Sequence, residues 1–314
     1  MRNIVVIGLG ALGRRHLQSL YELEDVKLYG VDNNRETLDR LRDEFSDVSF
    51  FDTVEDIPYD ISLCIIATNS NVRCSVFREL MAHSRVKYLI FEKVLFQKLE
   101  DYYYVSEVLA RQKTKAWVNC ARREWSSYEM IKKELAGEER FTYTVTGANW
   151  GLCCNGIHMI DLLQYLTDSK EFTVDSSRFL TGIKESKRKG FKEINGTIAG
   201  NCGKCAFFQI SCMPGEDTPS YIIINSENKS IAIDEAQNKA YISRRNNEWK
   251  WEKLDFIVEY QSQLSGRIAK RILDYGECKL PEYNFSMYTH IKYIEMFMEE
   301  FKKQGWEEER CPIT

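Results

Sequence analysis

A glycine-rich segment near the start of the chain has the residue types and spacing that bind phosphate groups. Gly8, Gly10 and Gly13 form the pattern G-x-G-x-x-G, with Ala11 and Leu12 between the last two. The first glycine allows a tight turn, the second lets backbone N–H groups approach a pyrophosphate, and the third permits close packing of a helix on a strand. The start of that helix adds positive electrostatic potential. A buried strand precedes the motif, so we predict a dinucleotide site rather than a turn without a ligand.

An acidic residue follows the glycine motif at the distance expected for ribose binding. Asp32 lies 19 residues after Gly13, at the end of the second predicted strand. A carboxylate there accepts hydrogen bonds from the adenine ribose hydroxyls and repels a 2′-phosphate. We therefore expect NAD to be preferred to NADP, with Arg35 close by weakening that preference. Asn33 is expected to contribute to the same cofactor site.

Further motifs follow in a recognisable order along the chain. They are Arg14-Arg15-His16 directly after the glycines, then Ala67-Thr68, Glu92-Lys93, and Gly156-Ile157-His158 with Asp161. Their order and spacing resemble the Gfo/Idh/MocA family, whose members are NAD(P)-dependent oxidoreductases that mostly act on sugars and polyols. The resemblance spans nearly the whole chain and is strongest over residues 1–165. It implies a Rossmann domain followed by a domain with an open β-sheet.

The resemblance implies a catalytic role for Lys93. It would face the nicotinamide and the substrate hydroxyl, where a cation stabilises the negative charge that develops as the oxygen loses its proton. The alternative is an exposed lysine at a strand end. The family's Glu-Lys-Pro motif reads Glu92-Lys93-Val94 here. We expect the peptide bond before Val94 to be trans, because a cis bond to a non-proline residue costs about 2.5–4 kcal/mol.

A second family pattern, Asp-x-Gly-x-His, reads Cys154-Asn155-Gly156-Ile157-His158 in this chain. His158 is the best acid/base candidate, because imidazole titrates near neutral pH. The alternative is a helix histidine that is buried and satisfied between the domains. Asn155 is expected to contact the substrate. Asp161 lies on the same helix face as His158 and either orients it or packs near the domain interface.

Two further segments complete the implied site. Thr68 and Asn69 stand where the family has a turn along the nicotinamide ribose. Arg122 and Arg123 suit a carboxylate or phosphate, or form an exposed capping pair. The implied cofactor contacts are Gly8, Gly10, Ala11, Leu12, Gly13, Asp32, Asn33, Thr68, Asn69, Glu92 and Lys93, and the implied substrate contacts are Lys93, Arg122, Asn155 and His158. We expect no metal ion.

The predicted strands and helices that would position these residues follow each other in a different order in the two parts of the chain. Over residues 1–122, short apolar runs at 3–7, 26–31, 61–67, 88–91 and 116–118 alternate with predicted helices at 12–23, 35–45, 72–83 and 103–111. This alternation predicts an α/β Rossmann domain with a parallel, doubly wound sheet. Over residues 123–314 we expect strands at 141–146, 172–180, 206–212, 221–225, 230–233 and 240–243, and helices at 157–166, 255–275 and 285–301. That pattern predicts an α+β domain with a mainly antiparallel open sheet.

Composition excludes several classes of protein. The chain of 314 residues has 43 Lys and Arg against 47 Asp and Glu, a net charge of −4, which argues against nucleic acid or a membrane surface as a partner. Its apolar stretches are shorter than the ~20 residues that span a bilayer, and no signal peptide is evident, so we expect a cytoplasmic protein. The ten cysteines are expected to be buried thiols. Cys202 and Cys205 are expected to flank a tight turn, and His16 to pack behind the glycine segment.

These observations predict an NAD(P)-dependent oxidoreductase that transfers a hydride between nicotinamide and a sugar-like substrate, meaning a sugar, sugar acid or nucleotide sugar. The alternative is a catalytically inactive dinucleotide-binding sensor or assembly subunit, because Cys154 and Val94 depart from the family's motifs. We also expect a homodimer or homotetramer. Its interface would be the exposed face of the second sheet, with Phe207, Phe208, Ile222 and Ile224 among the apolar residues on the strands concerned.

Overall fold

The computed structural model describes residues 1–216 and 218–314, and the chain forms two compact units. Unit 1 comprises residues 1–121, residues 259–291 and Thr314, and unit 2 comprises residues 122–258 and 292–313. The first break falls beside the predicted boundary at residue 122. Residues 259–291, which we expected in the second domain, cluster with unit 1 instead.

Unit 1 is built on a six-stranded parallel sheet in the order β3-β2-β1-β4-β5-β6. Its strands are β1 (Arg2–Ile7), β2 (Val26–Val31), β3 (Ser49–Phe51), β4 (Asp60–Ile66), β5 (Arg85–Phe91) and β6 (Lys115–Val118). The centre of the sheet is a continuous apolar core, since the side chains of Val5, Val6 and Leu63 are fully buried. The strand order reverses between β1 and β4. In open α/β sheets, ligands bind outside the carboxyl ends of the strands at such a reversal.

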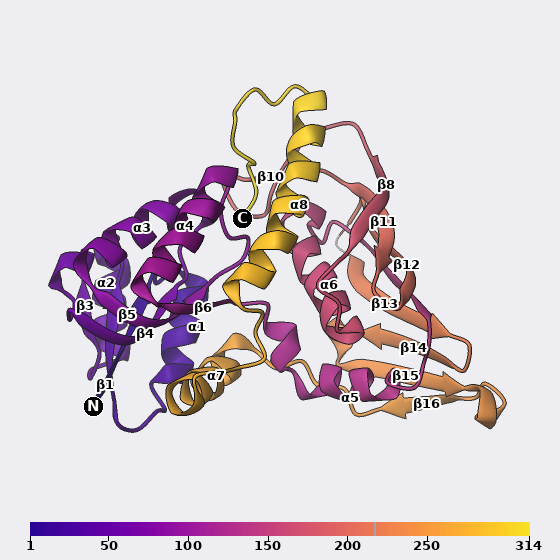
Figure 1. Ribbon diagram of the computed structural model, residues 1–314, viewed down its shortest axis with the longest axis horizontal. Helices are drawn as coiled ribbons and strands as arrows, with labels where there is room; N and C mark the ends of the chain where they lie inside the picture. Colours follow the sequence, from indigo (N-terminus) through magenta and orange to yellow (C-terminus); the bar gives the residue numbers. More distant parts are fainter. Residues whose placement is uncertain (217) are drawn as a thin grey trace. The chain divides into compact units, whose positions relative to one another are not determined.

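Helices cover both faces of this sheet (Figure 1). They are α1 (Ala11–Leu20), α2 (Arg35–Glu44), α3 (Ser70–His83), α4 (Leu99–Gln112) and α7 (Gln261–Tyr275), and α8 (Tyr283–Lys303) begins in unit 1 and ends in unit 2. Helix α7 packs closely on α1, where the Gly266 N–H donates to Ser19 Oγ at 2.8 Å. A Cβ at Gly266 would lie 2.5 Å from the Ser19 carbonyl oxygen, so the close approach requires glycine. This contact explains why residues 259–291 belong to unit 1.

Unit 2 is built on an eight-stranded sheet in the order β16-β15-β14-β13-β7-β12-β11-β8. Every neighbouring pair is antiparallel except β7 and β12. The strands are β7 (Phe141–Ala148), β8 (Thr173–Phe179), β11 (Gly196–Cys202), β12 (Cys205–Met213), β13 (Thr218–Ser226), β14 (Lys229–Asp234), β15 (Lys239–Arg244) and β16 (Trp251–Leu254), and β9 (Lys184–Glu185) pairs with β10 (Lys192–Glu193) separately. Cys202 and Cys205 face each other across the tight turn between β11 and β12, as predicted.

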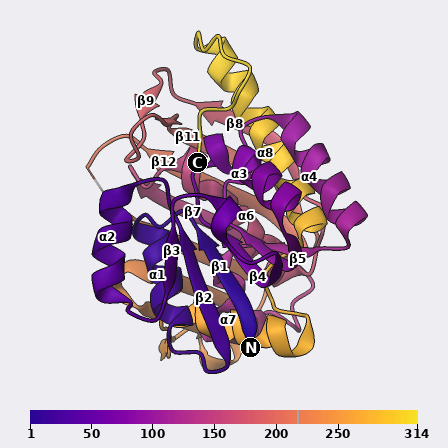
Figure 2. The same ribbon diagram turned by 90° about the vertical axis from the view of Figure 1, so that its left-hand side faces the viewer.

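The two helices α5 (Ser126–Glu134) and α6 (Leu152–Thr167) of unit 2 stand on one side of its large sheet (Figure 1). Figure 2 shows α2 and α3 of unit 1 on opposite sides of the strands of the unit 1 sheet. Of the four apolar residues named on these strands, Phe208, Ile222 and Ile224 are buried, because side chains alternate along a strand and these three belong to the buried face. Phe207 does lie on the opposite face and is 46% exposed. Other large apolar side chains exposed on the strands of this sheet are Met213, Tyr221, Tyr241 and Trp251.

Short 3₁₀ helices complete the described structure, at Val54–Asp56, Ala121–Glu124, Glu235–Gln237 and Arg245–Asn247. Among the described residues, no helix is both long enough and apolar enough to cross a membrane.

Candidate functional site

The fold requires two of the three glycines after β1, and the third leaves open space. Gly8 has φ of +89°, and a Cβ there would lie 2.7 Å from the backbone nitrogen of Thr68. A Cβ at Gly13 would lie 1.9 Å from the Gly8 carbonyl oxygen, so α1 can approach the turn only with glycine at this position. A Cβ at Gly10 would meet nothing within 4 Å. The space at the start of α1 is therefore open, which is where a phosphate group would bind.

The carboxylate of Asp32 is held in place at the end of β2 by two backbone groups. Its Oδ2 accepts a hydrogen bond from the Leu9 N–H at 2.6 Å, and its Oδ1 accepts one from the Asn34 N–H at 2.9 Å. Each carboxylate oxygen can accept further hydrogen bonds. The group is therefore oriented by the glycine segment and can still bind the hydroxyls of a ribose.

A pocket of about 340 Å³ lies at the carboxyl ends of β1, β2 and β4 in unit 1. Thr68 Oγ1 is buried and has no hydrogen-bond partner among the described residues. An unpartnered hydroxyl beside the oriented Asp32 carboxylate fits a ligand rich in hydroxyl groups, so the residues present are suited to the adenosine half of a dinucleotide. The lining is Ile7, Gly8, Val31, Asp32, Asn33, Asp52, Thr53, Val54, Thr68, Val72, Ser75, Val76 and Glu79.

Asp52 and Glu79 are acidic residues of this lining that the sequence analysis missed. Asp52 follows β3, a three-residue strand that was not predicted, and Glu79 lies inside α3. The identification of β3 would have drawn attention to Asp52, because it follows a strand end just as Asp32 does.

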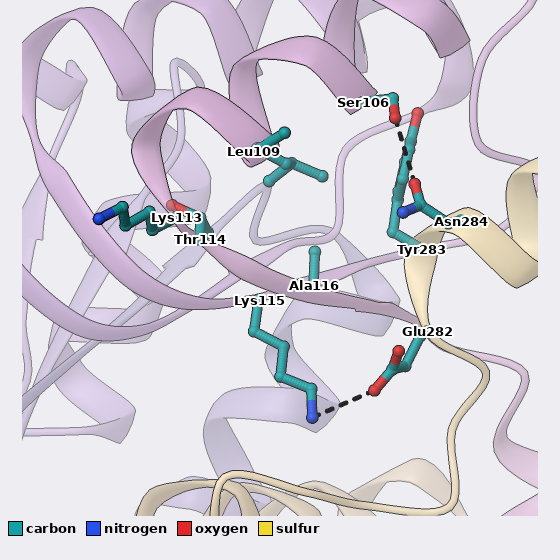
Figure 3. Close-up of a pocket in the computed structure, with 10 residues that line it drawn as sticks. Ser106, Leu109, Lys113, Thr114, Lys115, Ala116, Glu282, Tyr283 and Asn284 are labelled. Carbon is teal, nitrogen blue, oxygen red and sulfur yellow. Dashed lines mark hydrogen bonds and ion pairs between the residues drawn. The ribbon is translucent and has the colours of Figure 1, made fainter.

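A second pocket in unit 1, of about 270 Å³, lies where α4 ends and β6 and α8 begin (Figure 3). Lys115 Nζ lies 3.1 Å from Glu282 Oε1, and Ser106 donates to Asn284 at 3.1 Å. Lys115 is the first residue of β6, so this pocket lies at the amino end of a strand. Ligands of open α/β sheets bind at the opposite ends, and we assign no role to this pocket.

Glu92, which was expected to contact the cofactor, is buried in a closed ring of side chains that we call the polar ring: His16, Glu92, Asn119, Gln261 and Ser265. His16 Nε2 lies 3.0 Å from Glu92 Oε1, and His16 Nδ1 lies 2.8 Å from Ser265 Oγ. Asn119 donates to both Glu92 and Gln261, and Gln261 donates to Ser265 at 2.8 Å. Burial alone would raise the pKa of Glu92, but the hydrogen bond and charge of His16 lower it overall.

The peptide bond between Lys93 and Val94 is cis, so the expectation of a trans bond is wrong. The loop that contains it is held by a buried guanidinium. Arg73, which is 1% exposed, donates to the carbonyl oxygens of Val94, Leu95 and Thr68. Local sequence preferences could not reveal this contact, because Arg73 lies 21 residues before Val94. Its guanidinium thus joins the loops that follow β4 and β5, and Lys93 lies in the second of these.

His290 of α8 is a fully buried neighbour of this loop. Its Nδ1 donates to the Ser286 carbonyl at 2.8 Å, and its Nε2 has no partner among the described residues. Burial lowers the pKa of His290 to about 3, and the positive charges of Arg73 and Lys93 contribute to the decrease. The ring is therefore neutral at physiological pH.

In unit 2, His158 and Asn155 lie on α6, which begins at Leu152. The Asn155 side chain donates to the Trp150 carbonyl at 2.8 Å. Asp161 forms a two-pronged ion pair with Arg123, with both Asp161 oxygens 2.8 Å from guanidinium nitrogens. This buried pair fixes α6 about one turn beyond His158.

The predicted substrate residue Arg122 also forms a two-pronged ion pair. Its Nε and Nη2 donate to the two carboxylate oxygens of Glu235 at 2.7 and 2.6 Å, and Tyr128 donates to the same carboxylate. Burial opposes the charge on Arg122, but the Glu235 carboxylate raises the pKa of Arg122 overall. No motif in the sequence indicated Glu235, which lies 113 residues from Arg122 along the chain.

The N-terminal part of the chain matches a family model, described as an oxidoreductase family with an NAD-binding Rossmann fold, over residues 2–120. The family of this model is the Gfo/Idh/MocA family. The matched segment contains the glycine motif, Asp32, Thr68 and Lys93, so the expected cofactor residues all lie inside it. No curated protein matches the chain.

Solved structures similar to this chain span almost its full length. UDP-N-acetylglucosamine 3-dehydrogenase from Acidithiobacillus ferrooxidans has a TM-score of 0.74 at 13% identity and covers 94% of this chain and 96% of its own. A super-repressor mutant of Gal80p from Saccharomyces cerevisiae has a TM-score of 0.77 at 14% identity, covering 96% of both chains. A dehydrogenase from Clostridium difficile has a TM-score of 0.75 at 12% identity, covering 95% and 99%. At these identities the similarity shows the fold.

Replacing Gly10 with valine tests the open space at the start of α1. Gly10 has φ of −60° and ψ of −168°, which valine adopts, so the fold should tolerate the change. The side chain would occupy the space for the phosphates. We expect the affinity for NAD to fall at least about tenfold, which is about 1.4 kcal/mol, as measured by calorimetry.

Gly137→Val is the matched control, because a Cβ at Gly137 also meets nothing within 4 Å. It should bind NAD like the wild type. Equal NAD affinity in wild type and Gly10→Val would contradict a phosphate site at this turn.

The buried His290 should make the protein less stable in mild acid. The unfolded chain takes up the histidine proton near pH 6.5, whereas the native state does so only near pH 3, so falling pH favours unfolding between these values. Below pH 6.5 this residue should cost up to about 1.4 kcal/mol of unfolding free energy per pH unit. His290→Asn, which retains a donor for the Ser286 carbonyl, should remove that slope.

Urea unfolding of wild type and His290→Asn at pH 7.5, 6.5, 5.5 and 5.0 measures the difference, with His83→Asn as the control for a half-buried histidine. A constant difference between wild type and His290→Asn over this range would show that His290 titrates alike in the folded and unfolded states.

Proposed function

We propose that this protein is an NAD(P)-dependent oxidoreductase that transfers a hydride between nicotinamide and a sugar-like substrate. The observation that carries the proposal is the pocket at the reversal of strand order, where the glycine segment, the oriented Asp32 carboxylate and the unpartnered Thr68 hydroxyl are brought together. Membership of an oxidoreductase family supports the reaction class. The similar fold of a UDP-N-acetylglucosamine dehydrogenase supports a sugar-like substrate. A reducing compartment such as the cytoplasm suits the ten free thiols.

NAD is the proposed cofactor, with NADP the less favoured form. Three acidic residues, Asp32, Asp52 and Glu79, line the pocket and would repel a 2′-phosphate. Arg35 Nη2 lies 3.6 Å from Asp52 Oδ2, so its charge is partly offset. Gly8, Gly10 and Gly13, with Ala11 and Leu12, would hold the pyrophosphate, and Asn33 and Asn69 would add contacts. When bound, the nicotinamide accepts or donates the hydride.

Lys93 and His158 are proposed to handle the substrate proton. The Lys93 ammonium would stabilise negative charge on the substrate oxygen, and His158 would accept or return the proton, because an imidazole can both bind and release one. Glu92 would support Lys93 through the polar ring rather than by touching the cofactor. Arg122 and Asn155 remain proposed substrate contacts, with the Arg122 guanidinium oriented by Glu235.

A dinucleotide-binding regulator without catalysis is the second candidate. Cys154 in place of the motif acid favours it, since a thiol does not readily replace a carboxylate as a proton acceptor. A transcriptional regulator, Gal80p from Kluyveromyces lactis, also has a similar fold, with a TM-score of 0.74 at 16% identity.

Turnover with a panel of sugars, sugar acids and nucleotide sugars distinguishes these two candidates. We expect absorbance changes at 340 nm with at least one substrate, and faster turnover with NAD than with NADP. Lys93→Met and His158→Asn should each lower turnover about 10²- to 10⁴-fold, the range for a positioned acid or base. NAD binding should survive in both variants, because neither residue lies in the glycine segment. Tight NAD binding without turnover on any substrate class would favour the regulator.

Self-association through the open face of the unit 2 sheet is the proposed assembly. Exposed apolar side chains on its strands include Phe207, Met213, Tyr221, Tyr241 and Trp251, and large apolar patches usually mark interfaces. We expect a dimer or tetramer by light scattering at micromolar concentration. Tyr221→Lys combined with Tyr241→Lys should dissociate it, whereas Tyr59→Lys, a change at an exposed tyrosine of unit 1, should not. A monomeric wild type would refute this assembly.

A further inference from the structure

The start of α6, the helix that carries His158, is bound by a carboxylate from another part of unit 2. Helix α6 begins after Gly151 and has no acidic residue in its first turn. Glu193, at the end of β10, reaches this point instead. Its Oε2 accepts a hydrogen bond from the Cys153 N–H at 2.8 Å, and its Oε1 accepts one from the Cys154 N–H at 3.1 Å. The Glu193 residue is 8% exposed, so its negative charge lies in the interior of the unit.

We propose that Glu193 is a positioning residue for His158, and that its carboxylate supplies from β10 the negative charge that the sequence lacks at Cys154. The proposal rests on the proposed function, in which His158 exchanges the substrate proton. Glu193 would act through the histidine and not on the substrate itself.

The start of a helix carries positive charge. The unpaired N–H groups of a first turn carry about half a positive charge, which disfavours a second positive charge nearby. His158 follows Cys154 by four residues, so it lies about 6 Å further along the helix axis. Protonation of His158 would therefore be disfavoured by an uncompensated helix start. A full negative charge on Glu193 more than offsets that effect and stabilises the imidazolium.

The other titratable groups around Glu193 contribute no net charge near the start of α6. Burial raises the pKa of Cys153 on α6, Cys212 on β12, Tyr293 on α8 and Cys311 near the C-terminal end, so these groups are neutral at physiological pH. Further along α6, Asp161 is paired with Arg123, and the two charges balance.

The charged residues next to Glu193 on β9 and β10 do not neutralise its carboxylate. Lys192 on β10 directs its ammonium to Glu185 on β9. Burial raises the pKa of Glu193 itself, although hydrogen bonds from Cys154 and Cys153 oppose the shift. Its charge is therefore lost at a higher pH than that of an exposed glutamate, and the support for His158 is present above that pH.

Nuclear magnetic resonance titration of the histidine rings tests the proposal without any substrate. The chain has four histidines, so the ring signals are few, and His158→Asn assigns the one in question. Glu193→Gln keeps an oxygen for the helix N–H groups and removes the charge. We expect the His158 midpoint to fall by about half to one pH unit, as for the loss of one nearby charge. Adding Cys154→Asp to Glu193→Gln returns the charge and should restore the midpoint.

Glu185→Gln is the matched control, because it removes an exposed carboxylate from the same two-stranded sheet and should leave the midpoint unchanged. An unchanged midpoint in folded Glu193→Gln would overturn the proposal. A His158 midpoint below about 6 in the wild type would also overturn it, and this measurement needs no variant. It would show that Glu193 does not offset the positive charge at the start of α6. Turnover and NAD binding are measured separately, so a failure of the proposed function remains distinct from a failure of this inference.

Discussion

The buried polar ring of unit 1 is the interaction on which the geometry of its candidate site depends. It joins the helix after the glycine segment, the ends of β5 and β6, and α7, through His16, Glu92, Asn119, Gln261 and Ser265. Glu92 directly precedes Lys93, so the ring fixes the point from which the lysine emerges. A buried charge that loses its partner costs about 3–5 kcal/mol. The arrangement is therefore cooperative, since each member keeps another from being unpaired.

The sequence predicted the layout of unit 1 closely because its signals are local. Parallel strands buried on both faces appear as continuous apolar runs, and the glycine pattern depends on a few adjacent residues. The prediction failed where the signal was short or interrupted. The strand β3 has three residues, and β11 begins with glycine and contains a second one, so neither has the apolar run of a typical strand. The predicted helix at 255–275 begins only at Gln261, because the preceding residues are extended or irregular.

The sequence indicated candidate residues for the site but not the residues that hold them. Asp32 and Lys93 were predicted from spacing and resemblance, but Arg73, Glu193 and Glu235 each reach their partners from distant parts of the chain. Two departures from family motifs show the same principle. Where the proline is replaced by Val94, a buried guanidinium holds the loop, and where the acid is replaced by Cys154, a carboxylate arrives from β10. A sequence motif cannot indicate such replacements, because the replacing groups come from residues that are distant in the sequence and close only in the folded structure.

The discontinuous make-up of unit 1 has a consequence for its synthesis. The six strands of its sheet are complete at residue 118, but Gln261 and Ser265 of the polar ring leave the ribosome more than 140 residues later. At the usual 5–20 residues per second, the nascent sheet waits roughly 7–30 s for α7. During that interval the surface of α1 that α7 will cover is exposed. The polar ring around His16 and Glu92 then lacks Gln261 and Ser265. The nascent chain is therefore most exposed to aggregation and chaperone binding while unit 2 is being translated.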